Sequence, residues 1–183
     1  MNKKHCITIR EAYKDYKPPF DVVATVNRLL NGVPPKNLAG LKTVVVSSSQ
    51  NLSKKVRKAK AKARGKSYEL GKRRGSYHQK WKNEPAWITL LVDNILRHWQ
   101  QSLFHFTFFR DIAVSETLFH EIGHHIHDTR APEYREKEDV ADKWGRRLSR
   151  HYFRRRYWYL VPLFLLLRFT LKPLEVLRKR KKN

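Results

Sequence analysis

The chain has 183 residues, enough for one domain with a core and short of what two independent domains usually need. Hydrophobic residues make up 40% and aromatic residues 12%, which excludes a chain that is disordered throughout. Lys and Arg number 40 against 16 Asp and Glu, and the net charge of +24 favours anionic partners such as nucleic acid or acidic membrane surfaces. A single cysteine, Cys6, excludes an internal disulfide framework and a Cys-rich zinc ribbon, so any metal must be held by His and carboxylate groups.

The N-terminal part of the chain predicts a short helix followed by a strand. The apolar residues of 21–30 lie on one helical face, and Asn31-Gly32 supplies a stop signal. Residues 41–47 are β-branched and brief, which is typical of a buried strand, and we expect this strand to be the first of a sheet. Residues 1–16 contain no apolar run of the length that a signal peptide requires, so we expect a cytoplasmic protein.

A basic insertion follows at about residues 53–66. Its segment 54–66 holds eight basic residues in thirteen and almost nothing that could pack in a core. It predicts a solvated loop or an exposed helix. The alternative is nonspecific attraction of nucleic acid through the phosphates, although no aromatic residue is interleaved among the lysines.

Two strands and two helices are expected further along the chain. Residues 87–93 form the next clear strand, and residues 76–80 are a weaker strand candidate. The aromatic stretch 94–109 does not distinguish helix from loop. Asp111 is expected to cap a helix that runs through Asp128. Pro132 and Glu133 then resemble the first turn of another helix, with apolar residues every four positions at Val140, Trp144, Leu148 and Tyr152.

Residues 120–124 read His-Glu-Ile-Gly-His and predict a metal site. On a helix, His120 and His124 are one turn apart, roughly 6 Å along the axis, so both imidazoles can reach one metal ion. Glu121 lies beside this pair and is the candidate general base, since zinc lowers the pKa of a bound water from 15.7 to roughly 7. Gly123 leaves room against that face of the helix.

The following helix offers the remaining parts of such a site. Glu138 is the candidate third ligand, and Ala141 is a small residue that permits close packing. Asp142, one turn beyond Glu138, is placed to accept the second ring N–H of a liganding histidine and so to fix its tautomer. The open alternative is a structural helix whose histidines bind no metal.

The motif HEIGHHIH, followed by E-x-x-A-D-x-W at 138–144, resembles the gluzincin branch of the zincin metallopeptidases, and within it the ImmA/IrrE-type peptidases. The resemblance implies an α+β minimal zincin with a small sheet, a metal helix and a following Glu helix. It implies zinc held by His120, His124 and Glu138, with Glu121 as general base and Asp142 supporting a ligand. The expected function is therefore a zinc-dependent metalloendopeptidase that hydrolyses peptide bonds of a polypeptide substrate.

The other histidines and the strand 87–93 have more than one interpretation. His127 lies about 10.5 Å from His120 along the helix axis, too far to share the metal, so it is expected behind the ligands or at the surface. His125 points to a different face and is expected to be solvated, and His151 receives no role. The strand 87–93 is either core or the edge strand that pairs with substrate backbone. Tyr77, His78 and His105 are candidate transition-state stabilisers that the spacing does not separate.

The C-terminal region predicts an appendage. We expect a metallopeptidase domain over residues 1–156 and an apolar and basic tail over 157–183. The uncharged stretch 157–167 is well short of the roughly 20 residues of a membrane span. Aromatic and basic residues over 154–183 suit peripheral attachment to an anionic membrane, and packing against core or partner is the alternative. A rival to the peptidase is thus a basic protein that binds nucleic acid or anionic membrane and carries an inactive or structural zincin-like site.

Overall fold

The computed structural model describes residues 7–63, 66–130, 137–160 and 162. The chain divides into two compact units, Met1–Arg150 and His151–Asn183, and the fold described below is that of the first. The expected helix start at Pro132 and Glu133 and nearly all of the expected tail lie outside the described residues.

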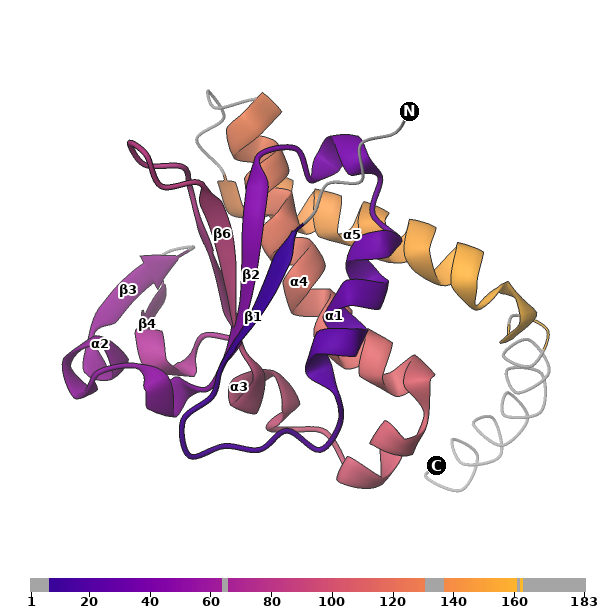
Figure 1. Cartoon of the computed structure of the whole chain (residues 1–183), viewed down its shortest axis with the longest axis horizontal. Helices are drawn as coiled ribbons and strands as arrows, with labels where there is room; N and C mark the ends of the chain where they lie inside the picture. The colour runs from indigo at the N-terminus through magenta and orange to yellow at the C-terminus, as the bar shows by residue number, and fades with distance from the viewer. Residues whose placement is uncertain (1–6, 64–65, 131–136, 161, 163–183) are drawn as a thin grey trace, which may run out of the picture. The chain divides into compact units, whose positions relative to one another are not determined.

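The centre of the fold is a four-stranded mixed sheet (Figure 1). Its strands run in the spatial order β1 (Thr8–Ala12), β2 (Leu41–Ser47), β6 (Ala86–Leu91) and β5 (Gly75–His78). The first three are mutually parallel, and β5 pairs antiparallel with β6 at one edge. The strand predicted at 41–47 is confirmed, but it is not the first of the sheet because β1 precedes it.

The apolar core lies between this sheet and two helices on one side of it, α1 (Val22–Asn31) and α4 (Thr107–Arg130) (Figure 1). Alternating side chains of the two central strands are fully buried: Val44, Val46, Ile88 and Leu90. The helix predicted at 21–30 is confirmed, and the Asp21 carboxylate caps it by accepting the Ala24 N–H at 2.8 Å. The predicted α+β class is therefore observed.

The basic insertion folds into regular structure. Its first part is the short exposed helix α2 (Lys54–Lys58), which confirms the exposed helix among the two alternatives for this part of the chain. The second part is β3 (Lys60–Ala63), which pairs antiparallel with β4 (Lys66–Glu69) in a separate two-stranded sheet. The pairing was not predicted, because lysines carry no strand periodicity.

The strand expected at 87–93 ends two residues early, at Leu91, where the short helix α3 (Val92–Leu96) begins. The Asp93 carboxylate accepts the Ser49 N–H at 2.9 Å, and the Asn94 amide donates to the Gly71 carbonyl at 2.7 Å. These polar side chains favour a turn over a continued strand. Short 3₁₀ turns connect other elements: Pro35–Asn37, Ser49–Asn51, Leu70–Lys72 and Gln101–His105.

Two long helices complete the fold, α4 and α5 (Lys137–Arg156). The expectation that Asp111 caps the first of them is wrong, because α4 begins four residues earlier, at Thr107. Asp111 instead lies inside the helix, fully buried, and its carboxylate accepts a hydrogen bond from Arg28 Nη2 on α1 at 2.6 Å. This ion pair joins the two helices that cover the sheet.

We expect Asp111→Ala to lower the free energy of unfolding by about 3 kcal/mol, because it leaves the largely buried Arg28 guanidinium without its carboxylate. The double variant Arg28→Met/Asp111→Leu should recover most of this loss, since an apolar pair removes both charges. Urea denaturation measures both. Lys72→Ala, which removes the exposed ion pair with Glu69, should cost less than about 0.5 kcal/mol. Equal losses for Asp111→Ala and Lys72→Ala would contradict a stabilising role for the buried pair.

Within the part of the chain that the structure describes, no helix has the length and apolar character needed to cross a bilayer. The peripheral attachment expected for residues 154–183 falls mostly on residues outside that part.

Candidate metal centre

The metal motif lies where α4 and α5 are in close contact. A Cβ atom at Gly123 would lie 2.5 Å from the Ala141 carbonyl oxygen and 2.8 Å from the Ala141 Cα. One at Gly145 would lie 3.3 Å from the His120 backbone nitrogen. The close packing expected of Gly123 and Ala141 is confirmed, and it brings the Glu138 helix against the histidine helix.

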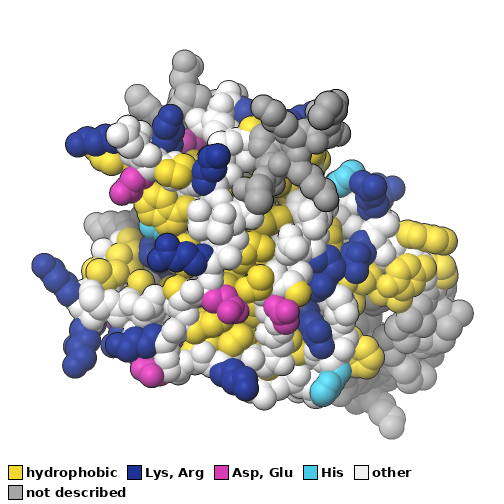
Figure 2. Space-filling model, viewed as in Figure 1, with side chains coloured by type: hydrophobic (Ala, Val, Ile, Leu, Met, Phe, Trp, Pro, Cys, Tyr) yellow, Lys and Arg dark blue, Asp and Glu magenta, His cyan; other side chains and the backbone are white. Residues whose placement is uncertain are grey.

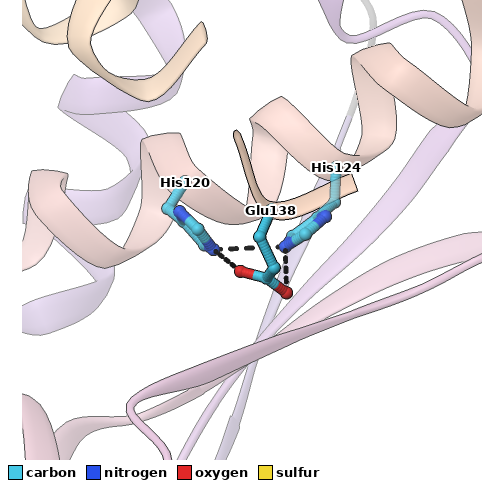
Figure 3. Close-up of side chains that lie close together, drawn as sticks. All are labelled: His120, His124 and Glu138. Atoms are coloured by element: carbon cyan, nitrogen blue, oxygen red, sulfur yellow. Dashed lines mark hydrogen bonds and ion pairs between the residues drawn. The ribbon is translucent and has the colours of Figure 1, made fainter. Parts of the chain in front are cut away.

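Three side chains converge at this crossing, His120 and His124 from α4 and Glu138 from α5, and we call them the triad (Figure 3). The Nε2 atoms of the two histidines lie 3.1 Å apart. The Glu138 carboxylate places Oε2 at 3.4 Å from Nε2 of His120 and Oε1 at 3.6 Å from Nε2 of His124. The structure thus brings together the three residues that the sequence nominated as ligands.

The spacing of these donor atoms suits a small tetrahedral cation. Zinc binds imidazole nitrogen and carboxylate oxygen at about 2.0–2.2 Å, so two ligand atoms of a tetrahedral site lie about 3.3 Å apart. The two histidine nitrogens, 3.1 Å apart, are close to that value, and each of them has a different oxygen of the Glu138 carboxylate at 3.4 or 3.6 Å. With one ligand atom taken from each residue, the three atoms lie within 4.8 Å of one another. A set of two imidazoles and one carboxylate fits zinc and leaves a fourth position open.

The surroundings of both histidines favour metal binding. The Asp142 carboxylate accepts the Nδ1–H of His120 at 2.8 Å, which directs Nε2 of that ring toward the triad. Burial and the neighbouring His120 lower the pKa of His124 to about 4, so its ring is neutral at physiological pH. Asp142 therefore occupies the supporting position that the sequence indicated.

Glu121 lies buried beside the triad, with 6% of its surface exposed. Burial, and then the charge of Glu138, raise the pKa of Glu121 to about 8, while a hydrogen bond from the Tyr77 backbone N–H opposes the shift. A Cβ at Gly75 would lie 2.7 Å from Glu121 Oε1, so only glycine fits there without displacing the carboxylate. The strand β5 thus determines where the Glu121 carboxyl lies.

The strand beside the site is β5. The alternative in which residues 87–93 are the edge strand is wrong, because β6 lies between β2 and β5 and is paired on both sides. The weaker strand candidate at 76–80 corresponds to β5, which is observed at Gly75–His78. Because its sequence is short and polar, the sequence indicated this strand only weakly, although the strand positions the site.

A hydrogen-bond chain holds β5 against α4. The Tyr77 hydroxyl donates to Asp128 at 2.9 Å and lies 3.2 Å from Nδ1 of His125, whose Nε2 lies 3.0 Å from the Ala39 carbonyl oxygen. Burial and Asp128 raise the pKa of Tyr77, which keeps its hydroxyl protonated as a donor. The expected solvated position of His125 is wrong: its side chain is fully buried in this chain of contacts.

The remaining candidate residues are placed as follows. His127 is buried at the cleft that the triad faces, which favours the position behind the ligands over the surface. His78 lines the same cleft and stacks on Trp87, with ring centroids 4.5 Å apart. His105 is exposed and does not line the cleft. Sequence reasoning missed Gly75, although a glycine that begins a strand candidate is the usual sign of a close approach.

Comparison of the chain with protein-family models, with curated proteins and with solved structures finds no match.

Proposed function

We propose that this protein is a zinc-dependent metalloendopeptidase, with the triad as zinc ligands and Glu121 as general base. The observation that carries the proposal is the convergence of His120, His124 and Glu138 from two helices, with the Glu121 carboxyl and the triad lining one open cleft. The two-histidine, one-carboxylate donor set with a neighbouring buried acid is an arrangement that suits zinc-dependent peptide hydrolysis.

In the proposed reaction each residue has a separate task. Bound zinc would supply a Lewis acid that polarises a peptide carbonyl and acidifies water. Glu121 would accept the proton of the attacking water and later deliver it to the leaving amine nitrogen. Burial and the charge of Glu138 raise the pKa of Glu121 in the metal-free protein, and the positive charge of bound zinc would lower it, which would leave the carboxylate able to accept the proton. Asp142 keeps the His120 ring in one tautomer throughout.

The resemblance of the motifs to gluzincins, and to ImmA/IrrE-type peptidases among them, supports the same proposal. A helix, a small sheet, a histidine helix and a Glu helix follow one another in the order that the resemblance implies. We propose a cytoplasmic enzyme that acts on polypeptides, with peripheral attachment to an anionic membrane through residues 154–183.

The first test is zinc content, measured by elemental analysis on protein purified without a histidine tag. We expect about one zinc per wild-type chain. His120→Ala and Glu138→Ala should lose bound zinc, because each removes a direct ligand and so lowers the affinity for zinc by more than about 10²-fold. His98→Ala is the matched control, since His98 is exposed and does not line the cleft. Circular dichroism establishes that each variant is folded. Folded wild-type protein without zinc affinity would refute the proposal.

A second candidate function rests on the net charge of +24 and on the exposed basic helix α2. Lys and Arg side chains are scattered over the face shown in Figure 2 rather than gathered in one stripe, which suits nonspecific attraction of polyanions. In this alternative the protein binds nucleic acid or anionic vesicles with a steep salt dependence that survives chelation of zinc. Absence of binding to both at low salt would exclude it.

A further inference from the structure

One end of the cleft is lined by arginines. The four are Arg73, Arg74, Arg146 and Arg150. Two come from the segment that leads into β5, and two come from one face of α5. Because the same cleft contains the triad, a polypeptide that extends along it from the triad toward this end would lie against these side chains.

The position of the α5 arginines follows from the helix packing. Gly123 of α4 faces Ala141, whereas His120 faces Gly145, so α5 runs antiparallel to α4. Arg146 follows Gly145, and Arg150 lies one further turn along α5, beyond His120 toward the start of α4. Both side chains are exposed, and neither forms an ion pair with a carboxylate of the described residues.

The other two arginines reach the same end from the sheet side. Nη1 of Arg74 lies 3.2 Å from the carboxylate of Glu116, which precedes His120 by one turn of α4. Arg73 lines the same cleft, where burial, and then the charge of Arg73, lower the pKa of His78. Its Nε is buried, and the described residues offer it no hydrogen-bond acceptor. A buried guanidinium N–H without an acceptor is costly, so an acceptor group of a ligand at this end of the cleft would be favoured there.

The carboxylates that line the cleft do not neutralise this end. Glu138 and Asp142 both contact His120. Asp128 accepts the hydrogen bond from Tyr77 at 2.9 Å. Among the carboxylates of the residues that the structure describes, the exposed Glu116 is the one that pairs with one of the four arginines. The positive charge at the arginine end therefore remains available to a ligand.

We propose that the arginine end of the cleft is a subsite for carboxylates of a polypeptide, so that the protein selects acidic segments. As a statement about substrates this rests on the proposed peptidase function. Guanidinium groups bind carboxylates through two parallel hydrogen bonds, and four of them line the same end of this cleft. The carboxylates can come from Asp and Glu side chains or from a free C-terminus.

Binding to the full chain in the Glu121→Gln variant tests this subsite without turnover. The probes are three fluorescent peptides of equal length: a Glu-rich peptide with an amidated C-terminus, its Gln counterpart with the same amide, and the Gln peptide with a free C-terminus. Fluorescence anisotropy should give an affinity for the Glu-rich peptide at least about tenfold above that of the amidated Gln peptide, with the difference reduced at high salt. Tight binding of the third peptide would identify the C-terminal carboxylate as the source.

Charge variants of α5 test whether the arginines of the cleft cause the difference in peptide affinity. Arg146→Gln/Arg150→Gln should lose about tenfold in affinity for the Glu-rich peptide. Lys143→Gln/Arg147→Gln removes the same charge from α5 at positions that do not line the cleft, and should lose less than about threefold.

Three outcomes would overturn the subsite. The first two are equal affinity for the Glu-rich and amidated Gln peptides, and equal losses of affinity in the two double variants. The third is displacement of the Glu-rich peptide by a single-stranded oligonucleotide of equal charge whose binding depends on the same arginines. The binding result does not require hydrolysis, so it stands if the peptidase function fails. If the wild-type enzyme cleaves neutral peptides and does not favour acidic ones, the proposed subsite is wrong and the proposed peptidase function stands.

Discussion

Replacing Glu121 by Gln should lower the rate of peptide hydrolysis by about 10²–10⁴-fold while zinc stays at one per chain, because the variant removes the proton acceptor and none of the ligands. Glutamine keeps the shape of the side chain and can still accept the Tyr77 backbone N–H that Glu121 accepts. The measurement is kcat/KM for a peptide substrate, together with zinc content on the same preparation.

The metal-free form of this variant should be at least as stable as the wild type. Burial raises the pKa of Glu121 to about 8, so the folded protein keeps this carboxyl neutral at pH values where the unfolded chain ionises it. That difference costs stability as pH rises above the unfolded pKa near 4.5, and glutamine removes the cost.

A control separates the general base from a general effect of lost negative charge. Glu11→Gln makes the same chemical change on β1, at the opposite edge of the sheet from β5, and should leave activity within about twofold. Activity of Glu121→Gln equal to that of wild type would exclude Glu121 as the base and leave zinc binding intact.

The parts of the site that sequence could predict are those set by the helical period. His120 and His124 are one turn apart, and Glu138 and Asp142 are one turn apart, so each pair shares a helix face whatever the tertiary structure. Gly123 and Ala141 were each expected to leave room for close packing, and the structure places them against each other.

The parts that could not be predicted depend on which face of each helix is covered by another element. His125 directly follows His124 in the sequence, and the helical period places its side chain on another face of α4. That face is buried because the sheet and the Ala39 carbonyl lie against it, which the order of residues in α4 does not reveal. Asp111 was mistaken for a cap because its partner, Arg28, is distant in sequence.

Whether a strand could be predicted also depends on what covers it. β2 and β6 are apolar because they are central, and their sequences predict them. β1 and β5 are edge strands with polar sequences, so no strand was expected at β1 and only the weak candidate 76–80 at β5. β5 is the strand that fixes Glu121 through Gly75 and Tyr77, and the element most important to the site was therefore one with a weak signal.

Gly123→Ala should disrupt the candidate metal centre without altering any ligand. The new methyl group would meet backbone atoms of Ala141 at 2.5 and 2.8 Å, and backbone cannot rotate away as a flexible side chain can. The helices must separate, which moves Glu138 and Asp142 away from His120. We expect a loss of about 2 kcal/mol in the free energy of unfolding, in spite of the gain of about 1 kcal/mol that alanine gives over glycine in a helix. Zinc affinity should fall at least about tenfold.

Gly145→Ala provides the matched comparison, because it is the same substitution on the partner helix at the same crossing. Its methyl group would come no closer than 3.3 Å to the His120 backbone, so a shift of a few tenths of an ångström accommodates it, and the helix propensity of alanine offsets the strain. Urea denaturation and zinc titration of both variants measure the difference. If Gly123→Ala binds zinc as tightly as Gly145→Ala, the spacing of α4 and α5 does not control the triad, and Glu138 is not held as a ligand by the contact between Gly123 and Ala141.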